Sequence, residues 1–151
     1  RFIAESADPE RVDLGRVVED AFETVDTADV RVAVDAPASA SIVANERALT
    51  GAVESAVDNA VAYADAAVSV DVDRRSEEGV VRVADDGPGI PQRELDALDS
   101  GSESALRHST GLGLWQLKWA VVTLDGELSF ETGEDGTVVE IAVVDADLTR
   151  E

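Results

Sequence analysis

The sequence of 151 residues lacks cysteine and methionine, and it contains a single histidine, His108, and a single lysine, Lys118. Without cysteine the chain can form neither disulfides nor thiolate metal sites, and one histidine argues against a zinc site. There is no signal peptide and no apolar run long enough to cross a bilayer, so we expect no direct membrane contact. Because the chain begins with Arg1, we expect a piece of a longer protein or a processed chain.

Basic residues are scarce as well: 12 of them stand against 33 acidic residues, for a formal net charge of -21. No basic patch is present that could neutralise phosphates, so we expect no nucleic-acid partner. The acids are dispersed through otherwise amphipathic segments. This pattern favours a protein from a high-salt cytoplasm, where counterions screen the repulsion between like charges. An acidic domain from an ordinary cytoplasm is the alternative.

The length fits one domain. We place it at residues 12–146, between a connection at 1–11 and a solvated tail at 147–151. Short apolar or alternating runs predict strands at residues 30–34, 41–44, 68–72, 80–84, 128–130 and 137–144. The turn at 74–79 is too short for a crossover, so the two strands beside it are expected to pair antiparallel.

Apolar residues at helical spacing predict helices at residues 14–25, 46–63, 92–98 and 111–124. Asp13 and Asn45 precede two of them and are the expected N-caps. Gly126 follows the last helix and is expected to end it. Together the elements predict an α+β fold, a two-layer α/β sandwich in which helices cover one face of a mixed, mostly antiparallel sheet.

Three segments carry polar residues and glycines that a core does not require: residues 54–60 in the long helix, the turn 85–91 after a strand, and the loop 109–114. Asn59 offers an amide oxygen that suits Mg²⁺. Asp85 offers a carboxylate that can accept the amino group of adenine. The free N–H groups where the loop opens a helix favour phosphate.

Each of these features also has a purely structural explanation. Asn59 could be a polar boundary residue, and 109–114 a surface loop. Asp85 could be a turn acid bonded to backbone, although Asp86 fits that role better. Two other phosphate-binding motifs are absent: there is no G-x-x-x-x-G-K-[ST] sequence, and glutamine takes the third glycine position of G-x-G-x-x-G.

In this order, ESAVDNA at 54–60, DDGPGIP at 85–91 and TGLGL at 110–114 resemble the N, G1 and G2 boxes of sensor histidine kinases. These kinases belong, with gyrase, heat-shock chaperones and mismatch-repair ATPases, to the superfamily with the Bergerat fold. The resemblance covers residues 12–145. The stretch 101–115 also looks like the haloarchaeal branch of the family, which agrees with the acidic composition.

The resemblance implies a binding site for ATP and Mg²⁺. Asp85 would bond the adenine amino group, Asn59 would hold the metal, and Glu54 would act as a base or orient water. Thr137 would sit under the adenine, and residues 96–110 would form a lid. The residues expected to contact the nucleotide are Asn59, Tyr63, Asp85, Gly87, Gly89, Ile90, Ser109, Thr110, Gly111, Leu112, Gly113, Leu114 and Thr137.

The resemblance also implies the catalytic domain of a two-component sensor, which transfers the γ-phosphoryl group of ATP to a histidine. Because His108 falls in the expected lid, the acceptor is expected on separate dimerisation helices, with a response regulator as a further partner. We expect a cytoplasmic domain, alone or within a membrane-bound sensor. Ser55 and Ala62 replace an asparagine and a basic residue of the family. Two alternatives therefore stay open: a nucleotide-dependent interaction module without turnover, and an anti-sigma-type serine kinase on the same fold.

Overall fold

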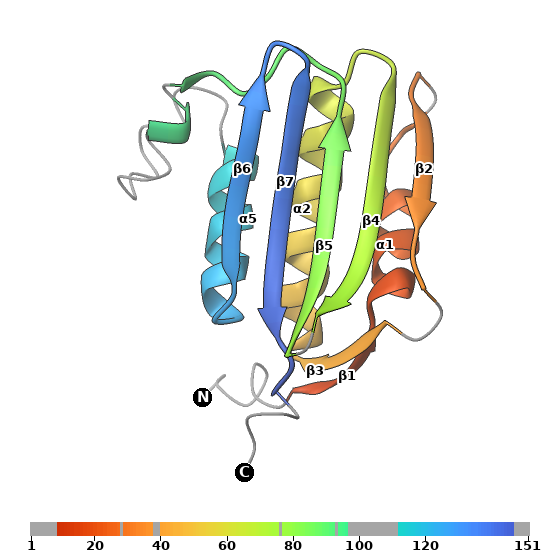
Figure 1. Cartoon of the computed structure of the whole chain (residues 1–151), viewed down its shortest axis with the longest axis vertical. Helices are drawn as coiled ribbons and strands as arrows, with labels where there is room; N and C mark the ends of the chain where they lie inside the picture. The colour runs from red at the N-terminus through yellow and green to blue at the C-terminus, as the bar shows by residue number, and fades with distance from the viewer. Residues whose placement is uncertain are drawn as a thin grey trace.

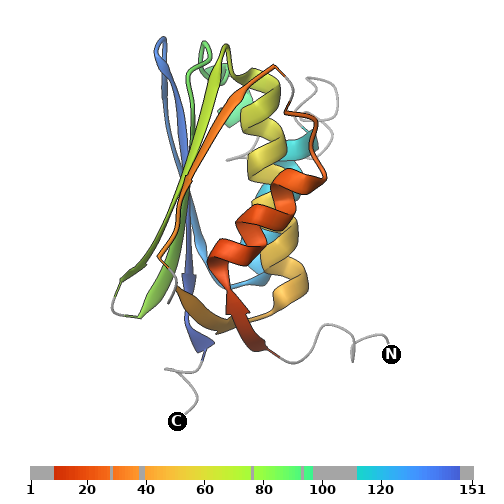
Figure 2. The same cartoon turned by 90° about the vertical axis from the view of Figure 1, so that its right-hand side faces the viewer.

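A computed structural model describes residues 9–27, 29–37, 40–75, 77–92, 94–96 and 112–146 of the chain. A five-stranded sheet forms one layer, and helices covering one of its faces form the other (Figure 1, Figure 2). The helices are α1 (Leu14–Glu23), α2 (Glu46–Tyr63) and α5 (Leu112–Thr123). The strands of the sheet are β2 (Arg31–Asp35), β4 (Ala67–Arg75), β5 (Glu78–Asp85), β6 (Glu127–Gly133) and β7 (Gly136–Val144). The predicted α+β fold is confirmed.

The strand order of this sheet is β2-β4-β5-β7-β6. Only β2 and β4 run parallel, and the other neighbouring strands are antiparallel. The antiparallel pairing of β4 with β5 follows from the tight turn between them, as predicted. The connection from β2 to β4 contains α2, which is long enough for a parallel crossover through the helical layer.

A second, two-stranded sheet joins β1 (Glu10–Asp13) to β3 (Ser41–Ala44) at one end of the sandwich. The sequence does not predict β1, because it places residues 10 and 11 in the connection at 1–11. Buried Asp145 ties this sheet to the main one. One of its carboxylate oxygens accepts the N–H of Val43 at 2.9 Å, and the other lies 2.8 Å from Nη2 of Arg74. A buried charge needs such partners to be tolerated.

The main core lies between the sheet and the helices. Its largest wholly buried side chains include Leu14, Val18, Leu49, Val53, Val57, Val68, Val70, Leu117 and Ile141. Both predicted N-caps are confirmed. The carboxylate of Asp13 accepts the N–H groups of Gly15 and Arg16, and the amide oxygen of Asn45 accepts the N–H of Ala48 at 3.1 Å. Among the described residues, no helix has the length and apolarity to span a bilayer.

The end of α5 differs from the prediction by one residue. The left-handed position is Asp125, with φ of 55°, and the glycine after it is not the residue that reverses the chain. The N–H of Asp125 donates to Val122 and that of Gly126 to Val121, the pattern of a Schellman cap. Gly126 is needed for another reason: a Cβ there would lie 2.6 Å from the carbonyl oxygen of Ala142.

Candidate functional site

The turn after β5 packs against the C-terminal end of α2. The N–H of Gly87 donates to Oδ1 of Asp85 at 2.9 Å, which fixes the carboxylate at the start of the turn. A Cβ on Gly87 would collide with the carbonyl oxygen of Tyr63, the last residue of α2. Only glycine allows this approach. The turn 85–91 therefore lies against the last residue of α2, three residues beyond the predicted segment 54–60.

The other side of the same turn is attached to the β6–β7 hairpin. Gly89 has a φ of 96°, and a Cβ there would lie 2.6 Å from the carbonyl oxygen of Gly133. The N–H of Ile90 donates to Oγ1 of Thr132 at 2.7 Å. That hydroxyl lies 2.8 Å from the hydroxyl of Thr137. The glycines thus let the turn lie close to two neighbouring backbones, and these hydrogen bonds hold it there.

Helix α5 reaches this turn through Leu114. Its side chain is fully buried and clusters with Ile90, while Leu95 and Phe130 pack against the pair. Helices α2 and α5 lie side by side and antiparallel, so the C-terminus of α2 and the N-terminus of α5 share one end of the sandwich (Figure 1). The C-terminal end of α2, the turn after β5 and the first turn of α5 therefore lie at that end, and residues 109–111 lie outside the described residues.

Asp85 is half-buried at the end of β5, in register with the buried Thr137 of β7. Burial raises the pKa of the Asp85 carboxyl, and the negative charges of Asp86 and Asp65 add to the rise. The N–H groups of Gly87 and Thr137 oppose it. A carboxylate partly withdrawn from water gains more from a further hydrogen-bond donor than an exposed one does. Asp85 therefore suits recognition of an amino group.

Asp86 has the structural role that the sequence favoured for it, but its partners are not in its own turn. One carboxylate oxygen accepts the N–H groups of Asp65, Ala66 and Ala67, at 2.9, 2.9 and 3.1 Å. The N–H groups of Ala66, Ala67 and Asp65 lower the pKa of Asp86 below its ordinary value. Asp86 thus anchors the connection between α2 and β4, while its neighbour Asp85 stays available.

An open hollow of about 360 Å³ lies at the β6–β7 turn and is lined by Asp85, Thr132 and Thr137 among others. Its remaining lining includes Glu131, Glu134 and Asp135. Three carboxylates repel phosphate. A nucleotide base held by Asp85 would therefore direct its phosphates the other way, toward α2 and α5.

Asn59 and Glu54 lie further back along α2. Asn59 is half-buried, one turn before Tyr63. Glu54 lines a separate hollow of about 260 Å³ with Ser55, Asp58 and Gln116 of α5, among others. At roughly 1.5 Å per residue, Glu54 is about 13 Å along the helix from Tyr63. The structure does not bring Glu54 next to Asp85.

Asn59 is the residue that the sequence predicts to hold Mg²⁺, and it presents one amide oxygen. Among the described residues, no group of three or more histidine, aspartate or glutamate side chains could hold a metal ion. Mg²⁺ commonly takes one or two protein oxygens and completes its shell with water and phosphate oxygens. A single amide oxygen at Asn59 fits that pattern.

The family of histidine kinase-, DNA gyrase B- and HSP90-like ATPases matches residues 44–147. The chain belongs to this ATPase family. The matched range contains α2, the turn 85–91, α5 and β7. Among proteins of curated function, none matches the sequence significantly.

Solved histidine kinase structures share the fold of this ATPase domain. A histidine kinase of Acinetobacter baumannii, AdeS, is 22% identical with a TM-score of 0.72, over 91% of this chain and 68% of that one. The mycobacterial sensor histidine kinase MprB is 22% identical with a TM-score of 0.68, over 90% and 97%. The catalytic domain of histidine kinase ThkA is 16% identical with a TM-score of 0.73, over 92% and 97%. The predicted Bergerat fold is confirmed.

Two residues at the site of this ATPase domain escaped the sequence analysis. The first is Glu94, which is 2% exposed and accepts a hydrogen bond from the hydroxyl of Tyr63 at 3.1 Å. This bond ties the helical residues 94–96 to α2. No pattern in the sequence predicts it. The second is Thr132. A tight turn between Gly133 and Gly136 joins β6 to β7 and places Thr132 opposite Thr137, so the two glycines in the sequence were the signal for this pair.

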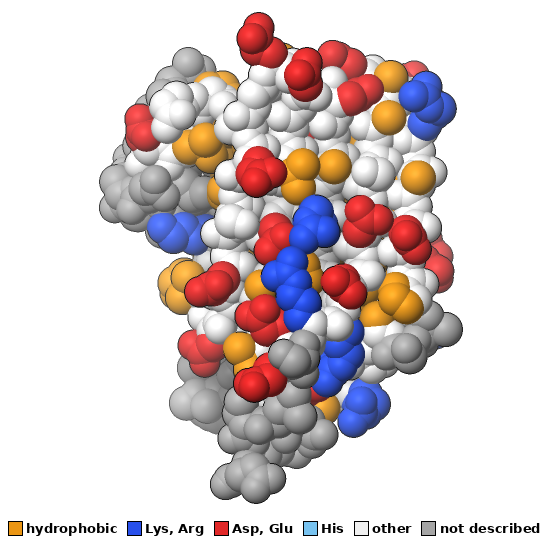
Figure 3. All heavy atoms as spheres, in the orientation of Figure 1, with side chains coloured by type: hydrophobic (Ala, Val, Ile, Leu, Met, Phe, Trp, Pro, Cys, Tyr) orange, Lys and Arg blue, Asp and Glu red, His pale blue; other side chains and the backbone are white. Residues whose placement is uncertain are grey.

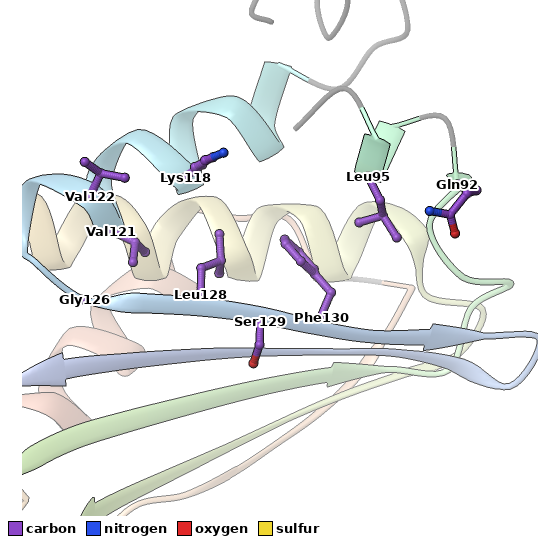
Figure 4. A pocket seen from close by; sticks show the side chains of 9 residues that line it. All are labelled: Gln92, Leu95, Lys118, Val121, Val122, Gly126, Leu128, Ser129 and Phe130. Atoms are coloured by element: carbon purple, nitrogen blue, oxygen red, sulfur yellow. The ribbon is translucent and has the colours of Figure 1, made fainter. Parts of the chain in front are cut away.

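A hollow of about 390 Å³ lies between α5, β6 and the helical residues 94–96, away from Asp85 (Figure 4). Leu128 and Phe130 project from β6 toward α5, and Leu95 faces them from the other wall. The lining combines apolar side chains with the polar side chains of Gln92, Lys118 and Ser129. None of the predicted nucleotide contacts lines it.

Part of the predicted site lies outside the described residues. Ser109, Thr110 and Gly111 belong to that part, as do His108 and residues 97–110 of the expected lid. Leu112 and Gly113 are the first two residues of α5. Leu114 is buried, so only its backbone could reach a phosphate. These contacts stay predictions.

Proposed function

We propose that this chain is the ATP-binding catalytic domain of a sensor histidine kinase, and that it transfers the γ-phosphoryl group of ATP to a histidine on a separate dimerisation domain. One observation carries the proposal. The half-buried carboxylate of Asp85, the close-fitting Gly87 and the first turn of α5 meet at one end of the sandwich. Membership of the ATPase family and the shared fold of histidine kinase catalytic domains support it.

Adenine binds at the turn after β5 in this proposal. Asp85 accepts a hydrogen bond from the exocyclic amino group, and Gly87 keeps the carboxylate oriented by donating its N–H. Thr137 lies beside Asp85 in the sheet and forms the floor with it. Gly89 and Ile90 continue the wall of the pocket, and the absence of a side chain on Gly89 lets the turn bend close to the hairpin.

The triphosphate then extends between α2 and the N-terminus of α5. Free N–H groups in the first turn of a helix, here at residues 112–114 of α5, bind phosphate oxygens without any basic side chain. Asn59 holds the metal through its amide oxygen. When bound, Mg-ATP supplies the phosphoryl group, and the metal neutralises the charge that develops on it. This arrangement suits a chain with 12 basic and 33 acidic residues.

The acceptor histidine comes from outside this chain, on dimerisation helices, and a response regulator takes the phosphoryl group afterwards. The imidazole nitrogen bonds to the γ-phosphorus while the bond to the departing ADP oxygen breaks. Glu54 lies behind Asn59 on α2, in the direction of the phosphates. There it can orient the acceptor or take its proton.

Label transfer tests the proposal. The chain is incubated in high salt with Mg²⁺, γ-labelled ATP and a separate helical hairpin that carries the acceptor histidine. Acid-labile label on the hairpin is the expected result, and the chain alone should take up little. Asp85→Asn should lose transfer, while Asp71→Asn, the same change at an exposed site on β4, should keep it. Tight binding without transfer would identify a nucleotide-dependent interaction module, and acid-stable label would identify a serine kinase.

A further inference from the structure

Within the described part of the chain, strand β2 is an unpaired edge of the main sheet, and its sequence is self-complementary. Its five residues read Arg-Val-Ala-Val-Asp, so a basic and an acidic residue are placed symmetrically about Ala33. All five are exposed, and β2 lies at the edge nearest the viewer in Figure 2. Val32 and Val34, at 38% and 40% exposed, are two of the few large apolar side chains on the surface of the described part. Natural proteins usually shield such an edge.

The backbone of β2 presents hydrogen-bonding groups to this edge at two residues. The N–H of Arg31 donates to the carbonyl of Ala66 at 2.8 Å, so the backbone N–H and C=O groups of residue 31 point toward β4. Successive residues of a strand direct their N–H and C=O groups to alternate sides. The backbone N–H and C=O groups of Ala33 and Asp35 therefore also point toward β4. Those of Val32 and Val34 point outward, away from the sheet.

We propose that β2 pairs antiparallel with β2 of a second copy of this chain, about a two-fold axis through Ala33, so that the two sheets become continuous. In this register Val32 lies opposite the second copy's Val34, and each such pair can exchange two hydrogen bonds. These are the two residues whose backbone groups face outward. The backbone direction and the sequence symmetry thus select the same register.

The side chains fit this register on both faces of the joined sheet. Val32 and Val34 are in register with the buried Val68 and Val70, so they lie on the helical face. Valines from the two copies would cover each other there. On the open face, Arg31 of each copy lies opposite Asp35 of the other, in a pair without backbone hydrogen bonds, where side chains approach most closely.

The open face also has a place for the incoming arginine. Asp35 is in register with Asp71 of β4, so two carboxylates lie side by side at this edge. The next residue in the row, Arg82 of β5, already bonds Glu140 at 2.6 Å. Figure 3 shows basic side chains gathered in the middle of this face with acidic ones around them. A second copy would place its Arg31 beside Asp35 and Asp71, the two carboxylates at the β2 end of this row.

Repulsion between two chains of charge -21 opposes this association. Salt screens that long-range repulsion more than it weakens a close Arg–Asp pair, so the dimer fraction should rise with salt. A five-residue strand makes a small interface, which implies weak association. Measurements therefore need high protein concentration or a cross-link that traps the pair.

A single cysteine provides the trap, because the chain has none of its own. Across the proposed axis the two Ala33 Cα atoms would be about 4.5 Å apart, which is within the range of a disulfide. Under mild oxidation in high salt, Ala33→Cys should form a disulfide dimer. The control is Ser69→Cys, exposed on the neighbouring strand and in register with Ala33. Equal dimer yields for the two variants would overturn the proposal.

Charge reversal tests the register by sedimentation in high salt. Arg31→Asp or Asp35→Arg alone should lower the dimer fraction several-fold, and the double variant should restore it. Val34→Pro removes an outward N–H and leaves the β4 ladder intact, so it should abolish association while the circular dichroism stays native. Identical sedimentation of all four variants and the unmodified chain would contradict the proposed pairing, and so would a chain that is monomeric at every salt and protein concentration.

Discussion

The hydroxyl groups of Thr132 and Thr137 lie 2.8 Å apart across the β6–β7 turn, and the first also accepts the N–H of Ile90. Thr137 is itself in register with Asp85. This pair of threonines therefore connects Asp85, the proposed adenine-binding residue, to the turn 85–91 that contains Ile90. The position of that turn depends on the hairpin as well as on its own glycines.

Removing the first hydroxyl should loosen this connection. Thr132→Val keeps the shape of the side chain and leaves the Ile90 N–H and the Thr137 hydroxyl without a partner. We expect a loss of about 1–3 kcal/mol in the free energy of unfolding, the usual cost of part-buried groups left unpaired. Urea unfolding measures it. Thr123→Val, which removes an exposed hydroxyl from α5, should change stability by less than about 0.5 kcal/mol; a similar loss in both variants would argue against the special role of Thr132.

Asp86 should make stability depend on pH in the acid range. Its carboxylate accepts three backbone N–H groups, which hold its pKa below the ordinary value. A lowered pKa means that the stabilisation is complete above the unfolded pKa, about 3.9, and is lost as pH falls through the folded pKa. Asp86→Asn should therefore lower the melting temperature at pH 7. The difference from the unmodified chain should shrink below about pH 4. A difference that stays constant down to acid pH would contradict this assignment.

The end of α5 offers a stabilising substitution. Asp125 is held at a φ of 55°, a conformation that glycine adopts without steric cost. Asp125→Gly should raise the free energy of unfolding by up to about 1 kcal/mol. Gly126→Ala should lower it, because its Cβ would lie 2.6 Å from the carbonyl oxygen of Ala142. If the two variants changed stability in the same direction, the left-handed position would be misassigned.

Local patterns in the sequence were sufficient to predict much of this fold. Asp13 and Asn45 cap their helices because an acceptor before an amphipathic run satisfies free N–H groups nearby in the chain. Strand β1 was missed because four residues with one buried side chain carry no period. Asp125 was missed because Gly126 is the more common residue at a left-handed cap, and only the close approach of Ala142 shows what that glycine does.

The residues of the candidate site could be predicted from the sequence, but the hydrogen bonds that hold them in place could not. Asp85 and Gly87 follow a strand in a glycine turn, a pattern visible in the sequence. The hydrogen bonds from the Tyr63 hydroxyl to Glu94 and from the Ala66 N–H to Asp86 join residues 31 and 20 positions apart. Such contacts depend on how α2 docks on the sheet, which no local pattern specifies.

Recognition of adenine by Asp85 is the central claim, and the measurement that tests it most directly is the affinity for Mg-ATP of Asp85→Asn, with Asp71→Asn as the control. The loss of a charge-assisted hydrogen bond should weaken binding by about 1.5–3 kcal/mol, while the control binds as the unmodified chain does. Because burial raises the pKa of Asp85, the nucleotide-free chain should lose stability as pH rises through that pKa. Asp85→Asn should therefore be at least as stable as the unmodified chain at pH 7.

The same titrations should be repeated across pH in high salt. Affinity of the unmodified chain should fall as Asp85 becomes protonated, beginning at a higher pH than an exposed aspartate would give, whereas Asp85→Asn should show no such fall. A folded Asp85→Asn variant that binds Mg-ATP as tightly as the unmodified chain would place the adenine elsewhere and contradict the account.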